Sequence, residues 1–471
     1  MDGKQGMYRY RLLRCIVIEA ATPLAVGSGD KGIMTDAAVA RDANGLPYIP
    51  GSSIAGVIRH AMAGYPGGIG KWMGSQDKGE GGSRLAVTDA RMLDSTGTPA
   101  DGLRPDAALD PLLKHFTGKV LPIRQHVCLS HLGTAEDTGK FDEEVVPAGT
   151  RFCFEMELLA DEGEEEGARA LMESITRRIQ ADTFRIGGGT RSGIGGMVAK
   201  RIMKCQIDLK DKAQLCAYLS KSSRLDPHWG GFEKQTTGQL EDSGFIHYTL
   251  DLIPDGFMFF GSGLGSPDAD MDYVRNPVVT WEEDDDNGHC TGTLVDEDDY
   301  ILIPASSLKG ALSHRTAYYY NQLEGVLAGR DSLKPSKFSE HTGSRNKAVQ
   351  VLFGSSGNDG TKKSRGLAIF SDITEKKPAG VYDKILNHVS IDRFTGGAVN
   401  GALFDEKTLY ARGVHFTTEI LVNREAEGKE HVIEAFERAL DDACNGLLPL
   451  GGGVNRGNGT FSMGKWHRED D

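Results

Sequence analysis

The chain has 471 residues, enough for two or more domains with their own hydrophobic cores. Its net charge of −14 argues at first against nucleic acid, and no stretch approaches the roughly 18 consecutive apolar residues of a transmembrane helix. Seven scattered cysteines without a C-x-x-C pair argue against a disulfide framework and against structural zinc, and the N-terminus is no signal peptide. We therefore expect a cytoplasmic protein with no membrane partner.

The first distinctive phrase, IPGSSIAGVIRH at 49–60, reads as a strand end followed by a helix. Pro50 offers no N–H to a sheet ladder, and Ser52 and Ser53 stand where a helix would start and be N-capped. Apolar residues then recur at spacings of three and four, as on the buried face of a helix. Such a helix start is a candidate anion site, although an ordinary strand-to-helix turn is the better interpretation of one copy alone.

The phrase returns as IPASSLKGALSHR at 303–315, and its neighbours return in the same order: Gly-Ser-Gly, a strand ending in Asp, a His-Val pair and a glycine loop. In the first copy these lie at 27–29, Asp89, His126 and 186–197, and in the second at 261–263, Asp372, His388 and 450–464. Matched positions are 254 to 264 residues apart, which is the size of a domain and too long for a solenoid repeat.

The chain therefore divides into two related α+β domains, at 1–220 and 245–471, joined by a polar, turn-rich linker at 221–244. The second domain opens with FIHYTLDL at 245–252. Its apolar residues alternate with polar ones, as in a half-buried strand.

Negative charge is concentrated in three runs, at 161–166, 282–286 and 296–299, which we expect to be solvated loop insertions. Basic residues fall on the repeated motifs instead. Glycine loops, serine-started helices and arginines can hold phosphates without reading bases, although a tight turn explains either glycine loop equally well. Two copies of these motifs favour a repeating polymer as the ligand, with a polynucleotide backbone as the candidate. The candidate RNA-binding residues are Ser52, Ser53, Arg59, Arg124, His126, Gly188, Arg191, Ser306, Ser307, Lys309, Arg315, His388, Arg393, Gly452 and Arg456.

Two segments carry a resemblance to a known family. TDAAVARDANGLPYIPGSSIAGVIR at 35–59 resembles the RAMP superfamily, and more narrowly the Cas7-type backbone subunits of type III CRISPR effector complexes. NHVSIDRFTGGAVNGALF at 387–404 is similar to the thumb-hairpin region of that family. The resemblance covers nearly the whole chain twice, as in the tandem double-Cas7 subunits of type III-D-like systems.

The resemblance implies a modified ferredoxin-like (RRM-like) fold for each domain. Each domain would grip the guide RNA (crRNA) with a palm and carry a thumb β-hairpin, here at about 124–147 and 386–411. The thumbs would push between guide and single-stranded target RNA and flip out a nucleotide pair at regular intervals. The implied partners are crRNA, target RNA and Cas10-, Cas5-, Cas11- and Cas7-like subunits.

The resemblance also implies target-RNA cleavage through one aspartate in the loop before RDANGLPYIP, which is Asp36. RNA carries its own nucleophile, the 2′-hydroxyl. One carboxylate that positions a divalent Mg²⁺ or Mn²⁺, or that helps to remove the proton, would therefore be sufficient. Asp42 is the weaker candidate, because RDANG reads as a turn. Without the family, Asp36 would itself be interpreted as a turn carboxylate.

The second copy departs from this pattern. Aligning NPVV with AAVA puts Arg275 at the place of Asp36, while Asp268, Asp270 and Asp272 lie close by. We favour Asp272 or Asp270, or a second site that only binds. Histidine can also act as a ribonuclease acid or base, and stacking or packing explains the candidates equally well. These candidates are His60, His126, His131, His314 and His388.

Three alternatives to a target-cleaving subunit remain. The chain could be a crRNA- and target-binding scaffold, with cutting or signalling done by its partners. It could be a guide-processing endoribonuclease, although no Tyr/Lys set can be placed. The third is a sugar-phosphate or nucleotide enzyme with glycine loops, which the absence of any standard nucleotide motif disfavours. The modest basic content predicts that the isolated chain binds RNA weakly.

Overall fold

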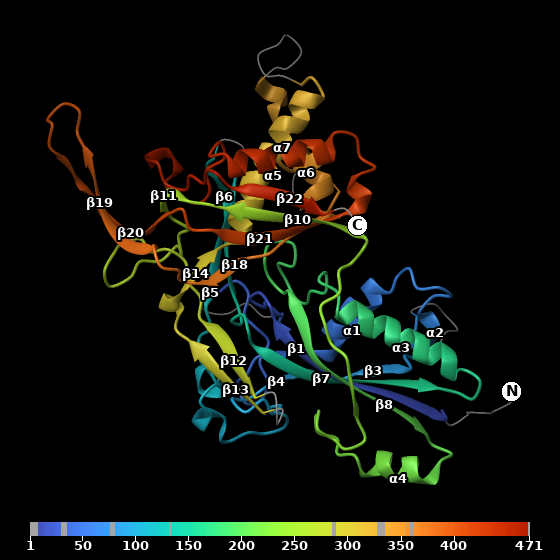
Figure 1. Cartoon of the computed structure of the whole chain (residues 1–471). Coiled ribbons are helices and arrows are strands. Elements are labelled where there is room, and N and C mark those ends of the chain that lie inside the picture. The colour runs from blue at the N-terminus through green and yellow to red at the C-terminus, as the bar shows by residue number, and fades with distance from the viewer. Residues whose placement is uncertain are drawn as a thin grey trace.

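The computed structural model describes residues 8–29, 35–75, 81–130, 133–284, 289–326, 335–355, 357 and 362–469. These residues form two main hydrophobic cores, one built mainly from the first half of the chain and one from the second half (Figure 1). Both halves mix helices with antiparallel sheet, which confirms the expected α+β class. No helix in these ranges is long and apolar enough to cross a lipid bilayer.

The sheet of the first half contains β1 (Tyr10–Ala20), β2 (Tyr48–Ile49), β3 (Leu85–Val87), β4 (Ala90–Met92), β7 (Arg151–Ala160), β8 (Met197–Asp208) and β9 (Glu233–Gln235). Its order is β2-β4-β7-β1-β8-β9, β3 also pairs with β7, and every pairing is antiparallel. The helices are α1 (Gly51–Ala61), α2 (Gly70–Met73), α3 (Glu165–Ile179) and α4 (Lys212–Ser220), with 3-10 turns at Ala107–Leu109 and Leu113–His115.

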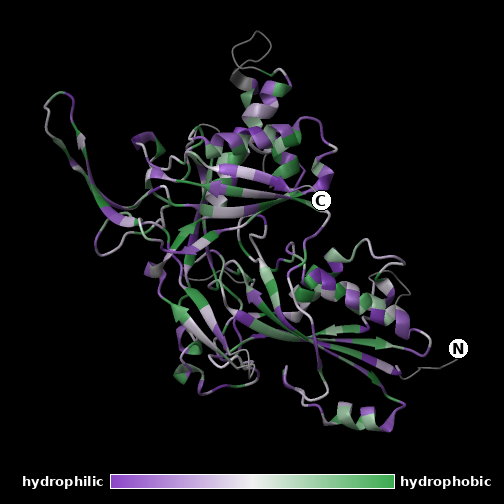
Figure 2. Cartoon of the chain, in the orientation of Figure 1, coloured by the Kyte–Doolittle hydropathy of each residue, from purple (hydrophilic) through white to green (hydrophobic). Residues whose placement is uncertain are grey.

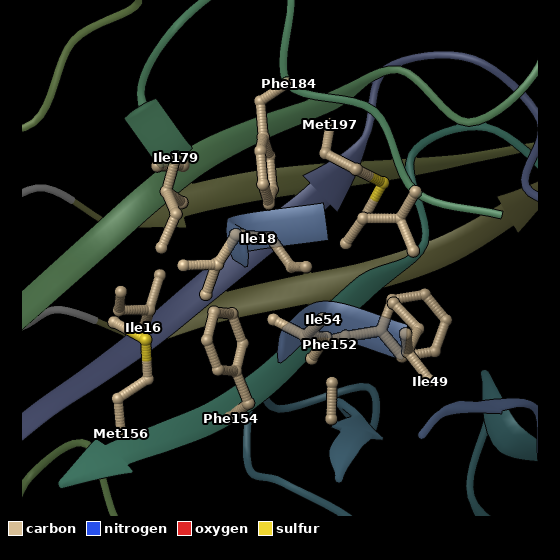
Figure 3. Close-up of a cluster of buried hydrophobic side chains, with 14 of the residues drawn as sticks. Ile16, Ile18, Ile49, Ile54, Phe152, Phe154, Met156, Ile179, Phe184 and Met197 are labelled. Atoms are coloured by element: carbon tan, nitrogen blue, oxygen red, sulfur yellow. The ribbon is translucent and has the colours of Figure 1, made fainter. Parts of the chain in front are cut away.

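Helices α1 and α3 pack on one face of this sheet, and Figure 3 shows buried side chains of that core. Ile16 and Ile18 of β1 and Phe152 and Phe154 of β7 are fully buried on that face, because side chains two apart on a strand point the same way. α3 contributes buried residues at spacings of three and four, which place one stripe of the helix against the strands. β1 and β7 are buried along most of their length, so both faces of these central strands are covered.

The second half repeats this arrangement. Its strands β10 (Phe245–Leu252), β17 (Ala368–Phe370), β21 (Phe416–Asn423) and β22 (Lys465–Glu469) form an antiparallel sheet in the order β17-β21-β10-β22. Its helices are α5 (Ala305–Leu323), α6 (Lys347–Leu352) and α7 (Val432–Cys444). The strand expected at 245–252 is confirmed: Ile246, Tyr248, Leu250 and Leu252 are fully buried, and the residues between them are half-buried.

Short pairs complete the second half: β14 (Tyr300–Ile303) with β18 (Ile373–Lys376), and β15 (Gly354–Ser355) with β16 (Ser364–Arg365). Its 3-10 turns are Glu297–Asp299, Pro335–Glu340, Gly343–Arg345, Arg424–Ala426 and Val454–Arg456.

β-Hairpins occupy both segments that the resemblance marks as thumbs. β5 (Ile123–Leu129) pairs with β6 (Ala135–Glu144), and β19 (Tyr382–Ile391) pairs with β20 (Ala398–Arg412), which also pairs with β11 (Asp255–Met258). The β19–β20 hairpin projects away from both cores, yet it carries exposed apolar side chains (Figures 1 and 2). Phe394 in its tip turn is completely exposed, and Arg393 beside it is exposed as well.

A further hairpin of the second half packs against the first half. It consists of β12 (Val278–Asp284) and β13 (His289–Val295). Val279 belongs to the first core, and Trp281 donates from Nε1 to the carbonyl oxygen of Gly149 at 2.8 Å. The guanidinium of Arg151 lies 4.6 Å from the centroid of the Trp281 ring. The described residues of this hairpin therefore follow the linker in sequence, but Val279, Trp281 and Leu294 pack in the first core.

The acidic runs are not the simple loop insertions that we expected. Glu165 and Glu166 begin α3, where a carboxylate favours the positive end of the helix dipole. Residues 282–284 belong to β12, and Glu283 pairs with Arg151 at 2.7 Å. Elements with specific partners therefore contain much of this charge.

Candidate RNA interface

Both serine phrases form helix starts, but carboxylates from distant strand ends bind their first N–H groups. Neither α1 nor α5 has a side-chain cap from serine, so that expectation is wrong. Asp89 accepts the N–H of Gly51 at 2.9 Å, and Asp372 accepts the N–H of Ala305 at 2.8 Å. Each aspartate already offsets the positive end of the helix dipole, which weakens these starts as anion sites. The exposed or half-buried side chains of the first turns are Ser52, Ser53, Ser306 and Ser307.

The two glycine loops are tight turns clamped against backbone. Gly187 and Gly451 have φ of 90° and 87°, and a Cβ on either would lie 2.2 or 2.4 Å from a facing carbonyl oxygen. Gly188 and Gly452 donate their N–H to those same carbonyls at 2.7 Å. These N–H groups therefore hold the loops and are not directed to a ligand.

The loop after each Gly-Ser-Gly makes the same backbone contacts in both halves. The bridges are Gly27–Val39 and Ala37–Glu143 in the first half, and Gly261–Tyr273 and Met271–Glu406 in the second. Equivalent loop residues are 234 positions apart and equivalent hairpin residues 263 apart. This register puts Asp270 at the place of Asp36. Arg275, which the sequence alignment had put at the place of Asp36, does not occupy that position.

Each half holds its loop aspartate beside a second aspartate. Asp36 donates its N–H to Oδ1 of Asp142 at 2.8 Å, and its own Oδ2 accepts the N–H of Asp142 at 3.3 Å. Likewise, Oδ2 of Asp270 accepts the N–H of Asp405 at 3.0 Å. Asp36 and Asp270 are exposed, while Asp142 on β6 and Asp405 on β20 are half-buried. An exposed carboxylate is thus anchored at the base of each hairpin.

Two other candidate carboxylates have structural partners. Asp272 is 5% exposed, pairs with Arg275, and is equivalent to Ala38 of the first half. Asp42 accepts the N–H of Asn44 at 2.8 Å within a turn, as its sequence context suggested. Of the carboxylates near position 270, Asp270 has the exposure and the register of Asp36.

The hairpin histidines stack on phenylalanines that precede the paired aspartates. His126 lies 4.8 Å from Phe141, centroid to centroid, with Nε2 3.1 Å from Oε1 of Glu143. His388 lies 4.9 Å from Phe404 in the same register. Stacking within the hairpin base accounts for both rings. The others are His60 on α1, His314 on α5, and His131, which lies outside the described residues.

Three of the predicted arginines bind protein groups. Arg59 donates to two carbonyl oxygens at the end of α2. Arg315 pairs with Asp442 of α7, and Arg456 pairs with the fully buried Glu406. Each of these three arginines therefore has a structural role within the fold.

Three more of the predicted cations meet where the halves touch, whereas Arg393 lies in the exposed tip turn of the β19–β20 hairpin. Arg124 forms a buried ion pair with Asp372 at 2.6 Å. Lys309 on α5 donates from Nζ to Oγ of Ser192 at 3.1 Å, next to Arg191 in the first glycine loop. Burial lowers the pKa of Lys309 to about 8, and the Arg191 guanidinium lowers it in the same direction.

Asp142 and Asp405 were missed in the sequence, although two signals mark them. Both stand in an identical Phe-Asp-Glu tripeptide, at 141–143 and 404–406. Asp36 and Asp270 also lie nine residues after the first glycine of their Gly-Ser-Gly segments. Ungapped spacing from that segment would have selected Asp270.

The resemblance implies a divalent metal at the loop aspartates. Among the residues with described positions, no group of three or more His, Cys, Asp or Glu side chains is arranged to hold a metal ion. Mg²⁺, however, commonly uses one or two carboxylates and keeps water and phosphate oxygens as its other ligands. The exposed carboxylates of Asp36 and Asp270 fit that smaller requirement.

Comparison with known proteins identifies a family for both halves of the chain. The RAMP superfamily model matches residues 17–198 and 256–462. One solved structure, described as "Type III-B Cmr-beta Cryo-EM structure of the Apo state", is 19% identical; the match covers 40% of this chain and 96% of that chain, with a TM-score of 0.28. No curated protein matches the chain.

Proposed function

The chain belongs to the RAMP superfamily, and from that premise we propose that it is a tandem Cas7-type subunit of a type III CRISPR effector complex. In this proposal it binds crRNA and target RNA beside Cas10-, Cas5-, Cas11- and Cas7-like subunits, and it cuts the target. One observation carries the cleavage proposal: the exposed Asp36 and Asp270 occupy the same anchored position in both halves.

The ferredoxin-like assignment is part of this proposal. Across the first sheet, four strands follow one another as the second, third, first and fourth in chain order: β4, β7, β1 and β8. The second sheet has the same arrangement: β17, β21, β10 and β22. A helix follows the first strand and another follows the third in each half. This is the order expected of a β-α-β-β-α-β split unit.

The chemistry needs little from the protein. The target's 2′-oxygen attacks the adjacent phosphorus, the bond to the 5′-oxygen breaks, and a 2′,3′-cyclic phosphate and a 5′-hydroxyl remain. Asp36 or Asp270 would orient the 2′-hydroxyl and accept its proton, while the N–H of Asp142 or Asp405 holds that carboxylate in place. A bound Mg²⁺ or Mn²⁺ would supply charge stabilisation at the phosphate.

A scaffold without cutting activity is the second candidate. The reciprocal hydrogen bonds between Asp36 and Asp142 are also what a purely structural loop anchor would make. In that case, partner subunits would do the cutting.

Target cleavage by the reconstituted complex separates the two candidates. The variants are Asp36→Ala and Asp270→Ala, and Asp268→Ala is the matched control because it is exposed on the same loop. We expect each of the first two to remove one cut while target binding is kept, and the control to remove none. Unchanged cutting in both Asp36→Ala and Asp270→Ala would refute the cleavage proposal and favour the scaffold.

A further inference from the structure

The outer edge of β8 is covered along only a few residues. β8 runs to Asp208, whereas β9 pairs with it only between Ile202 and Lys204. The chain before β9 forms a turn, in which the N–H of Phe232 donates to the carbonyl oxygen of Trp229 at 2.9 Å, so it does not continue beside β8. Among the described strands, β1 and β9 are the neighbours of β8, and the edge after Lys204 has no strand beside it.

This open edge forms the floor of a groove between two helices. The groove has a volume of about 470 Å³, and α3 and α4 lie on opposite sides of β8 there (Figure 1). The walls are Arg169 and Glu173 of α3 and Gln214 and Ala217 of α4, and Trp229 closes one end. An unpaired sheet edge inside a groove of this size is where an extended peptide can add as a further strand.

The backbone of β8 presents hydrogen-bonding groups to this groove. The N–H of Asp208 points away from β1, because it donates to Oε1 of Gln214 on α4 at 2.8 Å. Backbone groups of alternate residues point to the same edge of an antiparallel strand, so the N–H and C=O of Gln206 face the groove as well. The Gln214 side chain thus takes the place of a neighbouring strand at Asp208, whereas Gln206 has no strand beside it on this edge in the described structure.

The two walls of the groove differ in chemistry. Side chains at even positions of β8 lie on the α3 side, since Gln206 donates from Nε2 to Oε1 of Glu165 at 2.5 Å. Odd positions lie on the α4 side, because Arg11, the register partner of Ile207, lies 5.9 Å from the ring centroid of Tyr218 on α4. Ile207 is 2% exposed and makes the α4 side apolar, together with the groove-lining Trp229 and Ala217.

The α3 side carries positive charge that is only partly compensated. Arg14 of β1 is 4% exposed; its Nη2 pairs with Glu173 at 2.5 Å, while its Nε has no hydrogen-bond partner within the described residues. The half-buried Lys204 stands opposite Arg14 on the same face, and its ammonium has no ion-pair partner in the described part of the chain. Glu233 lies opposite Lys204 on β9, but it is exposed and forms no ion pair with it. Buried donors without acceptors cost free energy, so a carboxylate between Arg14 and Lys204 would be favourable.

We infer that this groove docks an extended segment of a partner protein, which adds to the edge of β8 as a further strand and alternates acidic with apolar side chains. An acidic side chain lies toward Arg14 and Lys204, and its apolar neighbours lie toward Ile207 and Trp229. The open edge from Cys205 to Ile207 takes about three residues, or roughly 10 Å of extended chain. α4 and this groove lie away from the β19–β20 hairpin, so the inference goes beyond the proposed RNA chemistry (Figure 1).

The test measures the binding of two fluorescent synthetic peptides to the full chain by anisotropy. In one peptide valine alternates with glutamate, and in the other valine alternates with lysine. The variants are Lys204→Glu and Lys204→Met, and Lys212→Glu is the matched control, since Lys212 is exposed on α4 and does not line the groove. We expect the glutamate peptide to bind at least about tenfold more tightly than the lysine peptide, and Lys204→Glu to lose at least about tenfold in affinity for it. The control should keep its affinity, and Lys204→Met should lie between the two.

Amide hydrogen exchange separates strand addition from binding by side chains alone. We expect the amides of residues 204–208 to exchange more slowly when the glutamate peptide is bound, and a peptide with proline at its centre not to bind. Absence of binding, equal binding of the two peptides, or binding without slower exchange would each overturn the inference. So would unchanged affinity in Lys204→Glu and Lys204→Met, whose folding is checked by thermal melting.

Two further results would show that another molecule occupies the groove. If a single-stranded RNA binds in a manner that depends on Lys204 and the glutamate peptide does not, the class of partner is wrong. If sedimentation shows that the peptide-free chain dimerises and that Lys204→Glu is monomeric, the occupant is a second copy of this chain. These measurements do not involve Asp36 or Asp270, so the cleavage proposal stands or falls separately.

Discussion

Replacing Asp372 by Asn removes one charge from the ion pair that joins the two halves. Arg124 is 4% exposed, and without Asp372 its charge would be buried and unpaired. Breaking such a pair costs about 3–5 kcal/mol. The asparagine oxygen can still accept the N–H of Ala305, so the α5 terminus loses little. We therefore expect about 3–5 kcal/mol less free energy of unfolding.

Urea titration of the RNA-free chain measures this loss, and Asp89→Asn is the matched control. Asp89 binds the N–H of Gly51 in the same way, but its ion pair with Arg91 is half-exposed, so we expect less than about 1 kcal/mol. Arg124→Met combined with Asp372→Asn leaves no unpaired charge and should recover part of the loss. If the two substitutions add within about 0.5 kcal/mol, the pair is uncoupled and the reasoning is refuted.

Two further predictions concern glycine and pH. Gly187→Ala should lower the melting temperature, because the φ of Gly187 is 90° and a Cβ there would lie 2.2 Å from a carbonyl oxygen. Gly56→Ala in α1 is the control, since a Cβ there meets nothing, and it should stabilise the fold by about 0.5–1 kcal/mol. Equal effects of the two substitutions would contradict this prediction. Burial lowers the pKa of Lys309 to about 8 from its usual 10.5. Between these two pH values the unfolded chain binds more protons than the folded chain, so the stability of the RNA-free chain should rise with pH over this range. RNA affinity should fall over the same range, and Lys309→Met should flatten both pH profiles.

The duplication was readable in the sequence because it rests on local patterns. Alternation over 245–252 specifies a half-buried strand wherever it occurs, and the structure confirms it. Proline followed by apolar residues at spacings of three and four likewise marked the starts of α1 and α5. The two hairpins were located through the family resemblance and not through periodicity.

The second aspartate pair lay in the sequence but was not recognised there. Alignment by apolar letters selected Arg275, whereas backbone bridges select Asp270. From the sequence, Asp272 was as good a candidate as Asp270, but in the structure Asp272 is buried and pairs with Arg275. Exposure and register therefore distinguish carboxylates that spacing alone leaves equivalent.

The sequence by itself determined two similar halves, their main strands and helices, and a loop aspartate in each. Only the tertiary structure decided which aspartates bind the helix starts, which loop aspartates are held beside hairpin aspartates, and where Arg124, Arg191 and Lys309 lie. Hydrophobic periodicity can be detected within about ten neighbouring residues, because it reflects the buried face of one helix or strand. Arg124 and Asp372 are 248 positions apart, and their contact exists only because two separately specified sheets pack together.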